Sequence, residues 1–301
     1  MSEEWKVQFP MNFGFLPLES CRYDGARVAI LPVPFDSTAS FRSGAREGPQ
    51  AILRASESIE VFDHETGTDL VNVGVATLPP PLLDRGNPEA MVDAVEEKVR
   101  AMVKDGKFPV LLGGEHTVSL GAIRALAAEE GPLTVLQIDA HLDLRDSFDG
   151  TRYSHACVMR RVIEDFPSCR LVQVGIRSVS AEEAGYLEET DLHPFFMERV
   201  RALGPKFVDR VIGDLGERVY LSLDLDGMDP AWMPAVGNPE PGGLGYYDLM
   251  DLLRSVCTRT RVLGADIVEL SPLPGEFRSD VAAAKILLKL IAWLFKDSPS
   301  T

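Results

Sequence analysis

The chain has 301 residues, of which 45% are hydrophobic and 25% charged, proportions that fit a soluble globular protein and exclude fibrous and disordered classes. Its 30 basic and 46 acidic residues give a formal net charge of −16, which disfavours nucleic acid and membrane surfaces as partners and favours cations. Four cysteines without CxxC spacing, and an N-terminus without an apolar signal segment, predict a cytoplasmic protein.

Short apolar runs rich in β-branched residues alternate with longer helical patterns along the chain. The expected strands are residues 27–35, 71–76, 108–113, 133–140, 170–176, 219–226 and 262–269. The expected helices are residues 49–56, 88–104, 118–129, 155–165, 181–189, 197–203, 246–258 and 280–295. This alternation predicts a parallel sheet covered by helices on both faces. No repeat or linker interrupts the pattern, so we predict one domain over residues 1–301.

Three polar motifs stand where expected strands end, at the edge of a parallel sheet that binds ligands in such folds. They read GGEH at residues 113–116, DAHLD at 139–143 and DLD at 224–226. Side chains alternate between two faces in extended chain, so we expect the Asp and His side chains of each motif to share one face. Each motif alone is also typical of a structural strand end. Their coincidence on three strands favours a functional site.

Carboxylates that converge near a sheet edge repel one another strongly in a low dielectric. Divalent cations remove this repulsion, and four Asp charges balance two dications with the imidazoles as neutral ligands. Oxygen-rich sites with some imidazole suit Mn²⁺ better than thiolate-preferring metals. The residues therefore predict a hydrolase with two divalent ions.

In this order, the motifs resemble those of the ureohydrolase family, which includes arginases and agmatinases. The family patterns GG[DE]H, DAHxD and SxDxDxxDP match here as GGEH, DAHLD and SLDLDGMDP, and the resemblance extends from the segment GAREGP at residues 44–49 to Glu269. It implies a three-layer α/β/α sandwich around a central, mainly parallel eight-stranded sheet. It also implies two Mn²⁺ per chain, a small cationic guanidino substrate and a homo-oligomer, either a trimer or a hexamer.

The resemblance also assigns individual roles. His116 and Asp143 would be terminal ligands of one ion, His141 and Asp226 of the other, and Asp139 and Asp224 would bridge both. Asp143 would also carry a proton to the leaving amine. Glu269 would grip the guanidinium group, and His155 would shuttle protons to solvent. We expect Glu115 to point away from the ions, Asp229 to fix a turn, and His64 and His193 to be structural or surface residues.

Among ureohydrolases, the chain is most similar to agmatinases, which convert agmatine to putrescine and urea in polyamine biosynthesis. The similarity lies in LDLRD at residues 142–146, in YSHACVMRR at 153–161 and in PEPGG at 239–243, and Arg145 stands near the position of an arginase Asn. The segment PAVGN at residues 234–238 departs from the agmatinase PGTGT. This departure leaves aminopropylagmatine and guanidinobutyrate open as substrates in place of agmatine, and arginine, the substrate of arginases, is a further alternative.

Two further classes remain as alternatives. A catalytically silent homologue would act as a binding or scaffold subunit, but the chain retains all six expected ligands. A deacetylase-type amide hydrolase would hold one zinc ion with fewer carboxylates. No residue can be assigned to the far end of the substrate, because Trp232 and Met233 suit either a pocket wall or core packing.

Overall fold

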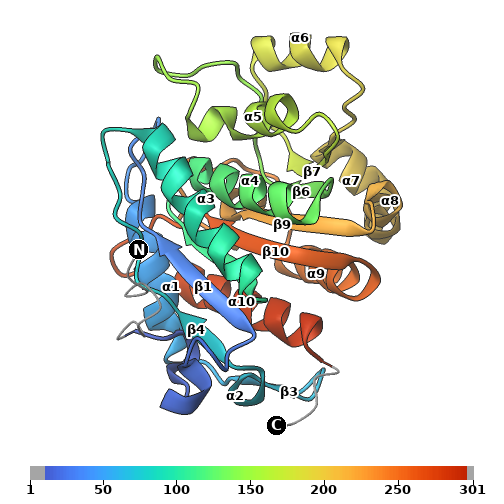
Figure 1. Ribbon diagram of the computed structural model, residues 1–301. Helices are drawn as coiled ribbons and strands as arrows, with labels where there is room; N and C mark the ends of the chain where they lie inside the picture. Colours follow the sequence, from blue (N-terminus) through green and yellow to red (C-terminus); the bar gives the residue numbers. More distant parts are fainter. Residues whose placement is uncertain (1–10, 297–301) are drawn as a thin grey trace.

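The computed structural model describes residues 11–296, so both ends of the predicted 1–301 domain, including the N-terminal segment considered for a signal, lie outside the described residues. A central eight-stranded sheet has the order β4-β1-β5-β10-β9-β6-β7-β8, and all of its strand pairs are parallel (Figure 1). Its strands are β1 (Val28–Val33), β4 (Val75–Thr77), β5 (Phe108–Gly113), β6 (Thr134–Ile138), β7 (Arg170–Ile176), β8 (Phe195–Phe196), β9 (Arg218–Asp224) and β10 (Arg261–Val268).

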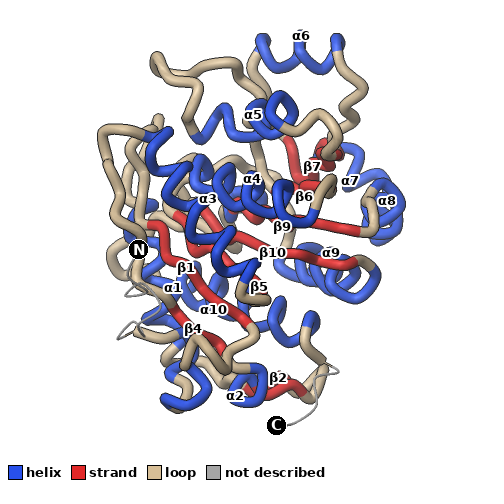
Figure 2. The backbone as a smooth tube through the Cα atoms, in the orientation of Figure 1, coloured by secondary structure: helices blue, strands red, loops and turns tan. Residues whose placement is uncertain are grey.

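Helices cover both faces of the sheet, as Figures 1 and 2 show. One apolar core joins the sheet to α1, α7, α8, α9 and α10, and a second core joins it to α3, α4 and α5. The helices are α1 (Gly48–Ser56), α2 (Leu70–Val73), α3 (Pro88–Lys104), α4 (Ser119–Glu130), α5 (Val158–Asp165), α6 (Ala181–Glu189), α7 (Met197–Leu203), α8 (Phe207–Asp214), α9 (Tyr246–Arg259) and α10 (Arg278–Leu294). The predicted three-layer architecture with an eight-stranded sheet is confirmed.

The prediction of a strand over residues 71–76 is wrong in its first half. Residues 70–73 form one helical turn, because the Asp69 side chain accepts a hydrogen bond from the Val71 N–H at 2.9 Å. Gly74, with φ of 72°, ends that turn, and the strand begins only at Val75. The sequence prediction also missed α8 and the edge strand β8, whose two residues are too few to produce a clear pattern.

The apolar stretch near the C-terminus forms α10, where a helix was expected over residues 280–295, and α10 packs against α1 and α9. Its Lys289 side chain lies 2.7 Å from the buried Asp63 carboxylate. Asp63 belongs to a small hairpin of β2 (Phe62–Asp63) and β3 (Thr68–Asp69), so this ion pair ties the hairpin to the helix. Within residues 11–296, no helix combines the length and apolar character that crossing a bilayer requires.

Candidate metal centre and active site

Four neighbouring strands in the middle of the sheet, β5, β10, β9 and β6, bring the candidate residues together. All four are parallel, so their carboxyl ends meet at one edge. The GGEH motif follows β5, Glu269 follows β10, the DLD motif begins at the last residue of β9, and the DAHLD motif follows β6. Strand order therefore gathers residues that are up to 153 positions apart in the chain.

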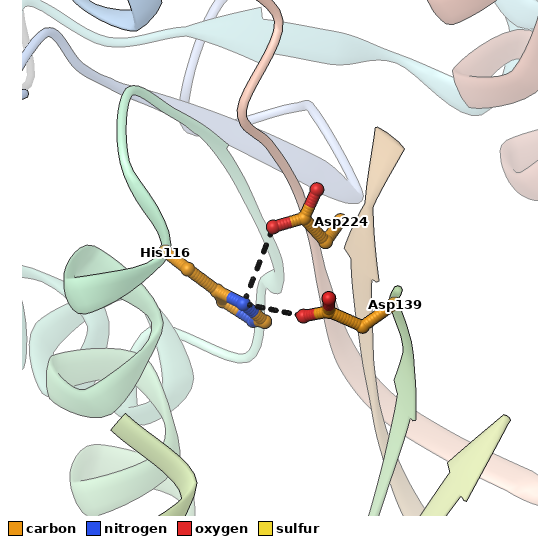
Figure 3. A group of neighbouring side chains, drawn as sticks. All are labelled: His116, Asp139 and Asp224. Atoms are coloured by element: carbon orange, nitrogen blue, oxygen red, sulfur yellow. Dashed lines mark ion pairs between the residues drawn. The ribbon is translucent and has the colours of Figure 1, made fainter. Parts of the chain in front are cut away.

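His116 lies at the centre of the first cluster. Its Nδ1 atom is 2.9 Å from Asp143 Oδ2, 3.0 Å from Asp139 Oδ2 and 3.4 Å from Asp224 Oδ2. Figure 3 shows the ring pointing between the Asp139 and Asp224 carboxylates. All four side chains are at least nine-tenths buried, and the ligand atoms of His116, Asp139 and Asp224 are close enough to hold one ion.

His141 forms a second cluster beside the first. Its Nδ1 atom is 3.0 Å from Asp226 Oδ2 and 3.5 Å from Asp139 Oδ1, and these three residues also form a group that could hold an ion. Asp139 belongs to both clusters, since Oδ2 faces His116 and Oδ1 faces His141. The carboxylate is fixed by hydrogen bonds from Gln137 Nε2 at 2.7 Å and from the His141 N–H at 2.6 Å.

The strand-alternation argument for the motifs does not hold in the structure, although their polar side chains do converge. Strand β6 ends at Ile138, before the DAHLD motif, and Asp143 adopts φ of 56°. Asp226 lies in a 3-10 turn, Leu225–Gly227, in which the Asp224 carboxylate accepts the Asp226 N–H at 2.8 Å. Turns beyond the strand ends therefore aim these carboxylates. A positive φ at a non-glycine residue is strained and is often found at functional sites.

The hydrogen bonds of His116 test whether the first cluster fits a cation. Ser222 Oγ lies 2.9 Å from His116 Nε2 and itself donates to the Asp266 carboxylate at 3.0 Å. The serine oxygen thus accepts a hydrogen bond from the Nε2–H group, and in the neutral imidazole this leaves a lone pair on Nδ1. Nδ1 is buried and, among the described residues, has no hydrogen-bond partner. A bare lone pair facing three carboxylates is repulsive unless a cation lies between them, so the donors present suit a divalent ion.

Electrostatics at the centre also favour a cation. Burial, followed by the charges of Asp226 and Asp139, raises the pKa of Asp224 well above its usual value. Burial and the Asp139 charge raise the pKa of Asp143 to about 7. Ionised carboxylates at these positions destabilise the protein, and a bound dication reverses that penalty.

Gly114 in GGEH allows the chain to pass close to the loop after β1. A Cβ atom on Gly114 would lie 1.9 Å from the Phe35 carbonyl oxygen and 2.7 Å from its carbon, both backbone atoms. The Glu115 N–H donates to that same carbonyl at 2.7 Å. The motif therefore crosses over the loop after β1, and His116 points inward as a result.

Glu269 lies at the end of β10 beside this centre. Its φ is 66°, and its Oε1 accepts the His116 N–H at 2.8 Å. Burial, followed by the charge of Glu115, raises the pKa of Glu269 well above its usual value. The side chain is therefore a buried carboxyl without an ion-pair partner among the described residues, in a place that suits a guanidinium group.

A pocket of about 350 Å³ opens from the ligands to the surface. His141, Asp143 and His155 line it, and Phe148, Asn238 and Glu240 are among its other lining residues. Burial, followed by the charges of His141 and His116, lowers the pKa of His155 to about 4. Trp232 and Met233 do not line this pocket: Met233 is buried in the core, and the half-exposed Trp232 packs on Tyr246.

Glu115 points away from the candidate ligands, as predicted, and its carboxylate accepts three hydrogen bonds from two threonines. Its Oε2 accepts the Thr38 N–H at 2.7 Å, and its Oε1 accepts the hydroxyls of Thr38 at 2.7 Å and Thr117 at 2.9 Å. Burial raises the pKa of Glu115 to about 7, whereas these three donors lower it. Asp229 accepts the N–H groups of Ala231 and Gly242, which fits the predicted turn.

Sequence reasoning missed the residues that support the site. Ser222 and Asp266 are polar positions inside otherwise apolar strands, and this contrast could have marked both. Arg177 follows β7 and donates to the carbonyls of Asp226 at 2.6 Å and Glu240 at 2.7 Å, so it links the ligand turn to the loop at the pocket mouth. No sequence pattern indicates that arrangement. His64 and His193 are exposed and take no part.

The parallel sheet with a carboxylate and imidazole cluster at its carboxyl edge defines a class, the metal-dependent α/β/α hydrolases. Residues 26–292 match the arginase family, and the chain belongs to that family. It is therefore a ureohydrolase, and the family is one of binuclear metal enzymes.

Three relatives describe the similarity more closely. The chain is 39% identical over 279 residues to the N(1)-aminopropylagmatine ureohydrolase of Synechocystis sp., covering 90% of each chain. It is 34% identical over 271 residues to the agmatinase of Pyrococcus horikoshii, covering 88% of this chain and 91% of the relative. The crystal structure of agmatine ureohydrolase of Thermoplasma volcanium matches with a TM-score of 0.86 and 35% identity over 98% of both chains.

Proposed function

We propose that this ureohydrolase removes urea from N1-aminopropylagmatine, leaving a triamine, and that it uses two Mn²⁺ ions. The observation that carries the proposal is the pocket, whose lining includes the candidate ligands His141 and Asp143 together with Glu240, a residue that bears a carboxylate. A guanidine with an amine-bearing tail matches that polarity. Agmatine, which the sequence analysis placed first, has the same reacting group and a shorter tail. The identity to aminopropylagmatine ureohydrolases, at 39%, supports the longer substrate.

In the proposed centre, His116 and Asp143 would hold one ion, His141 and Asp226 would hold the other, and Asp139 and Asp224 would serve as ligands to both. Oxygen and imidazole donors of this kind suit Mn²⁺. When bound, two divalent ions act as Lewis acids and acidify water, so that a nucleophile is present near neutral pH. The hydrogen bond that Asp139 accepts from Gln137 and the one that His116 Nε2 donates to Ser222 would orient these ligands before any ion binds.

The remaining chemistry belongs to side chains of this chain. Glu269 binds the planar guanidinium through charge-assisted hydrogen bonds and holds its carbon toward the nucleophile. Water oxygen bonds to that carbon, and the bond from carbon to the alkylamine nitrogen breaks. Asp143 takes up a proton from the attacking water and transfers it to the departing nitrogen, and His155 exchanges protons between the site and solvent. His155 suits this task because it lines the pocket but is not completely buried.

The far end of the substrate meets the mouth of the pocket. Glu240 lines it, and no hydrogen bond or ion pair is formed by the Glu240 carboxylate within the described part of the chain. We assign this carboxylate to the distal ammonium group. The exposed ring of Phe41 and the ring of Phe148, which also line the pocket, would pack along the methylene groups.

One observation favours a second candidate, a guanidino carboxylate such as guanidinobutyrate. Arg145 also lines the pocket, where its guanidinium group lies 5.1 Å from the centre of the Phe148 ring. Within residues 11–296 it forms no ion pair, so it could receive a carboxylate. The two candidates differ in the sign of the distal charge, which a substrate panel distinguishes directly.

The test is urea release from aminopropylagmatine, agmatine, guanidinobutyrate and arginine, measured side by side with Mn²⁺-loaded protein. We expect aminopropylagmatine to have the highest kcat/KM. Glu240→Gln should lower kcat/KM for amine-tailed substrates by about tenfold, as expected for one lost charge-assisted contact, while the exposed Glu97→Gln leaves it unchanged. Preference for guanidinobutyrate or arginine would refute the proposal.

Other expectations complete the proposal. We propose that residues 1–301 act as one domain, in the cytoplasm, in a homo-oligomer that is a trimer or hexamer, and in polyamine biosynthesis. The family resemblance supports these statements. Light scattering after size-exclusion chromatography measures the oligomer, and elemental analysis measures the metal content per chain.

A further inference from the structure

Two residues outside the ligand set control the surroundings of the His155 ring. Thr38, in the loop after β1, places its Oγ1 atom 3.3 Å from His155 Nδ1 and 3.2 Å from the His155 backbone nitrogen. The same hydroxyl lies 2.7 Å from Glu115 Oε1. Glu115 also accepts the Thr38 N–H at 2.7 Å, so the carboxylate forms two hydrogen bonds with Thr38.

The number of protons available to these groups determines which of them donates and which accepts each hydrogen bond. A threonine hydroxyl has one proton and two lone pairs, and its shortest contact, to the carboxylate, takes the proton. Both lone pairs of Thr38 Oγ1 then face His155. One accepts the backbone N–H, and the other can bond to Nδ1 only if Nδ1 carries a proton.

We infer that Glu115 and Thr38 are positioning residues that hold neutral His155 with its proton on Nδ1, leaving Nε2 as the nitrogen that exchanges protons in the pocket. Nε2 lies 3.3 Å from Ser40 Oγ, and both Ser40 and His155 line the pocket. The histidine nitrogen that carries the proton is set by the partner of its other nitrogen. The inference rests on the proposed shuttle role of His155 and adds the residues that prepare it.

One other hydroxyl competes for the same nitrogen. Ser154 Oγ also lies 3.3 Å from His155 Nδ1, and it caps the following turn by accepting the Ala156 N–H at 3.4 Å. Among the described residues, the Ser154 hydroxyl donates no hydrogen bond to a carboxylate. It could therefore donate to Nδ1 and favour the opposite tautomer. Substitutions at Ser154 and Thr38 can therefore be compared directly, because both hydroxyls lie 3.3 Å from His155 Nδ1 and are expected to favour opposite tautomers of His155.

The experiment reads the tautomer directly. The full chain is labelled with ¹⁵N-histidine, and the ring nitrogens are recorded without substrate, first without added metal and then with diamagnetic Mg²⁺. The five histidines of the sequence keep the spectrum simple, and His155→Ala identifies the resonances of interest. We expect parent, Thr38→Ser and Ser154→Ala to carry the proton on Nδ1. Thr38→Val and Glu115→Gln should shift the population toward Nε2.

Kinetics supply the second measurement. Thr38→Val should lower kcat by roughly three- to tenfold, the weight of one hydrogen bond, with little change in KM. Thr38→Ser should restore kcat, which loss of the threonine methyl alone would not allow. A proton on Nε2 in the parent, or an unchanged tautomer in Thr38→Val, overturns the inference. If Thr38→Val does not fold, the parent, Thr38→Ser and Glu115→Gln spectra decide the question. Absence of urea from every guanidine would instead refute the proposed function, because the tautomer is read without substrate.

Discussion

Replacing Asp224 with Asn should have opposite effects on the stability of the metal-free protein and on that of the metal-loaded protein. Asp224 is buried, and its pKa is raised well above the usual value by burial and by the charges of Asp226 and Asp139. When the pKa of a carboxyl group rises on folding, the folded protein loses stability as the pH increases above the pKa of that group in the unfolded chain, which is near 3.9. At neutral pH the ionised Asp224 therefore destabilises the metal-free fold. Asn removes that charge and keeps an oxygen for the Asp226 N–H.

The expected sizes follow from the same geometry. Neutralising one buried, poorly compensated charge should stabilise the metal-free protein by about 1–2 kcal/mol. With an unfolding entropy of about 2.1 cal/mol/K per residue, this raises the Tm of a 301-residue chain by about 2–3 °C. In the parent, each ion present at about 100 times its dissociation constant adds about 2.7 kcal/mol, or about 4 °C. A variant lacking a shared ligand should lose most of that gain.

Calorimetry with and without Mn²⁺ measures both effects in one series. Without metal, Asp224→Asn should melt above the parent, and with saturating Mn²⁺ it should melt below the parent. Urea release should be nearly abolished, since the substitution removes charge from both proposed ion positions. A parent Tm that does not respond to Mn²⁺, or a metal-free variant that melts several degrees below the parent, would refute the reasoning.

Three more outcomes are expected. His155→Ala should lower kcat by about 10²-fold with a modest change in KM, and added imidazole should restore part of the rate; parent-like turnover would remove His155 from the mechanism. Gly114→Ala should cost at least about 4 kcal/mol by equilibrium unfolding, because its Cβ meets backbone 1.9 Å away, while Gly185→Ala on exposed α6 should be neutral or slightly stabilising. Lys289→Met should destabilise the protein by about 3 kcal/mol at neutral pH by leaving Asp63 unpaired. Burial raises the pKa of Asp63, but Lys289 and Thr66 hold it below its usual value, so this stabilisation is present above about pH 4 and is lost as pH falls; an equal difference at acid pH would contradict it.

The sequence was sufficient to predict most strands of the sheet and the convergence of the candidate ligands. Apolar runs locate the strands, and in a parallel sheet every carboxyl end lies at one edge, so polar residues after β5, β6 and β9 must meet if those strands are close in space. Their side-chain directions could not be predicted. Asp143 and Asp226 reach the centre through turns. The conformation of such a turn depends on hydrogen bonds that exist only in the folded protein, so the residue types alone do not predict it.

The supporting contacts were beyond sequence reasoning for a related reason. Thr38 and Glu115 are 77 positions apart, and their contact depends on the loop after β1 crossing the GGEH motif. Arg177 binds six carbonyl oxygens, and carbonyl groups are present at every residue, so no residue type marks its partners. The substrate choice likewise depends on the mouth loop, which has no periodic pattern.

The position of β10 has a consequence for how the protein is made. This strand is the last of the ten described along the chain, yet it lies between β5 and β9 in the middle of the sheet. During synthesis, the strands before it are complete while a central place in the sheet is still empty, and β5 and β9 each present an unpaired edge. The candidate ligands that follow those strands can come together only after residue 268 has left the ribosome. Assembly of the candidate metal centre is thus expected late in maturation, and a stalled nascent chain is exposed to aggregation at those two edges.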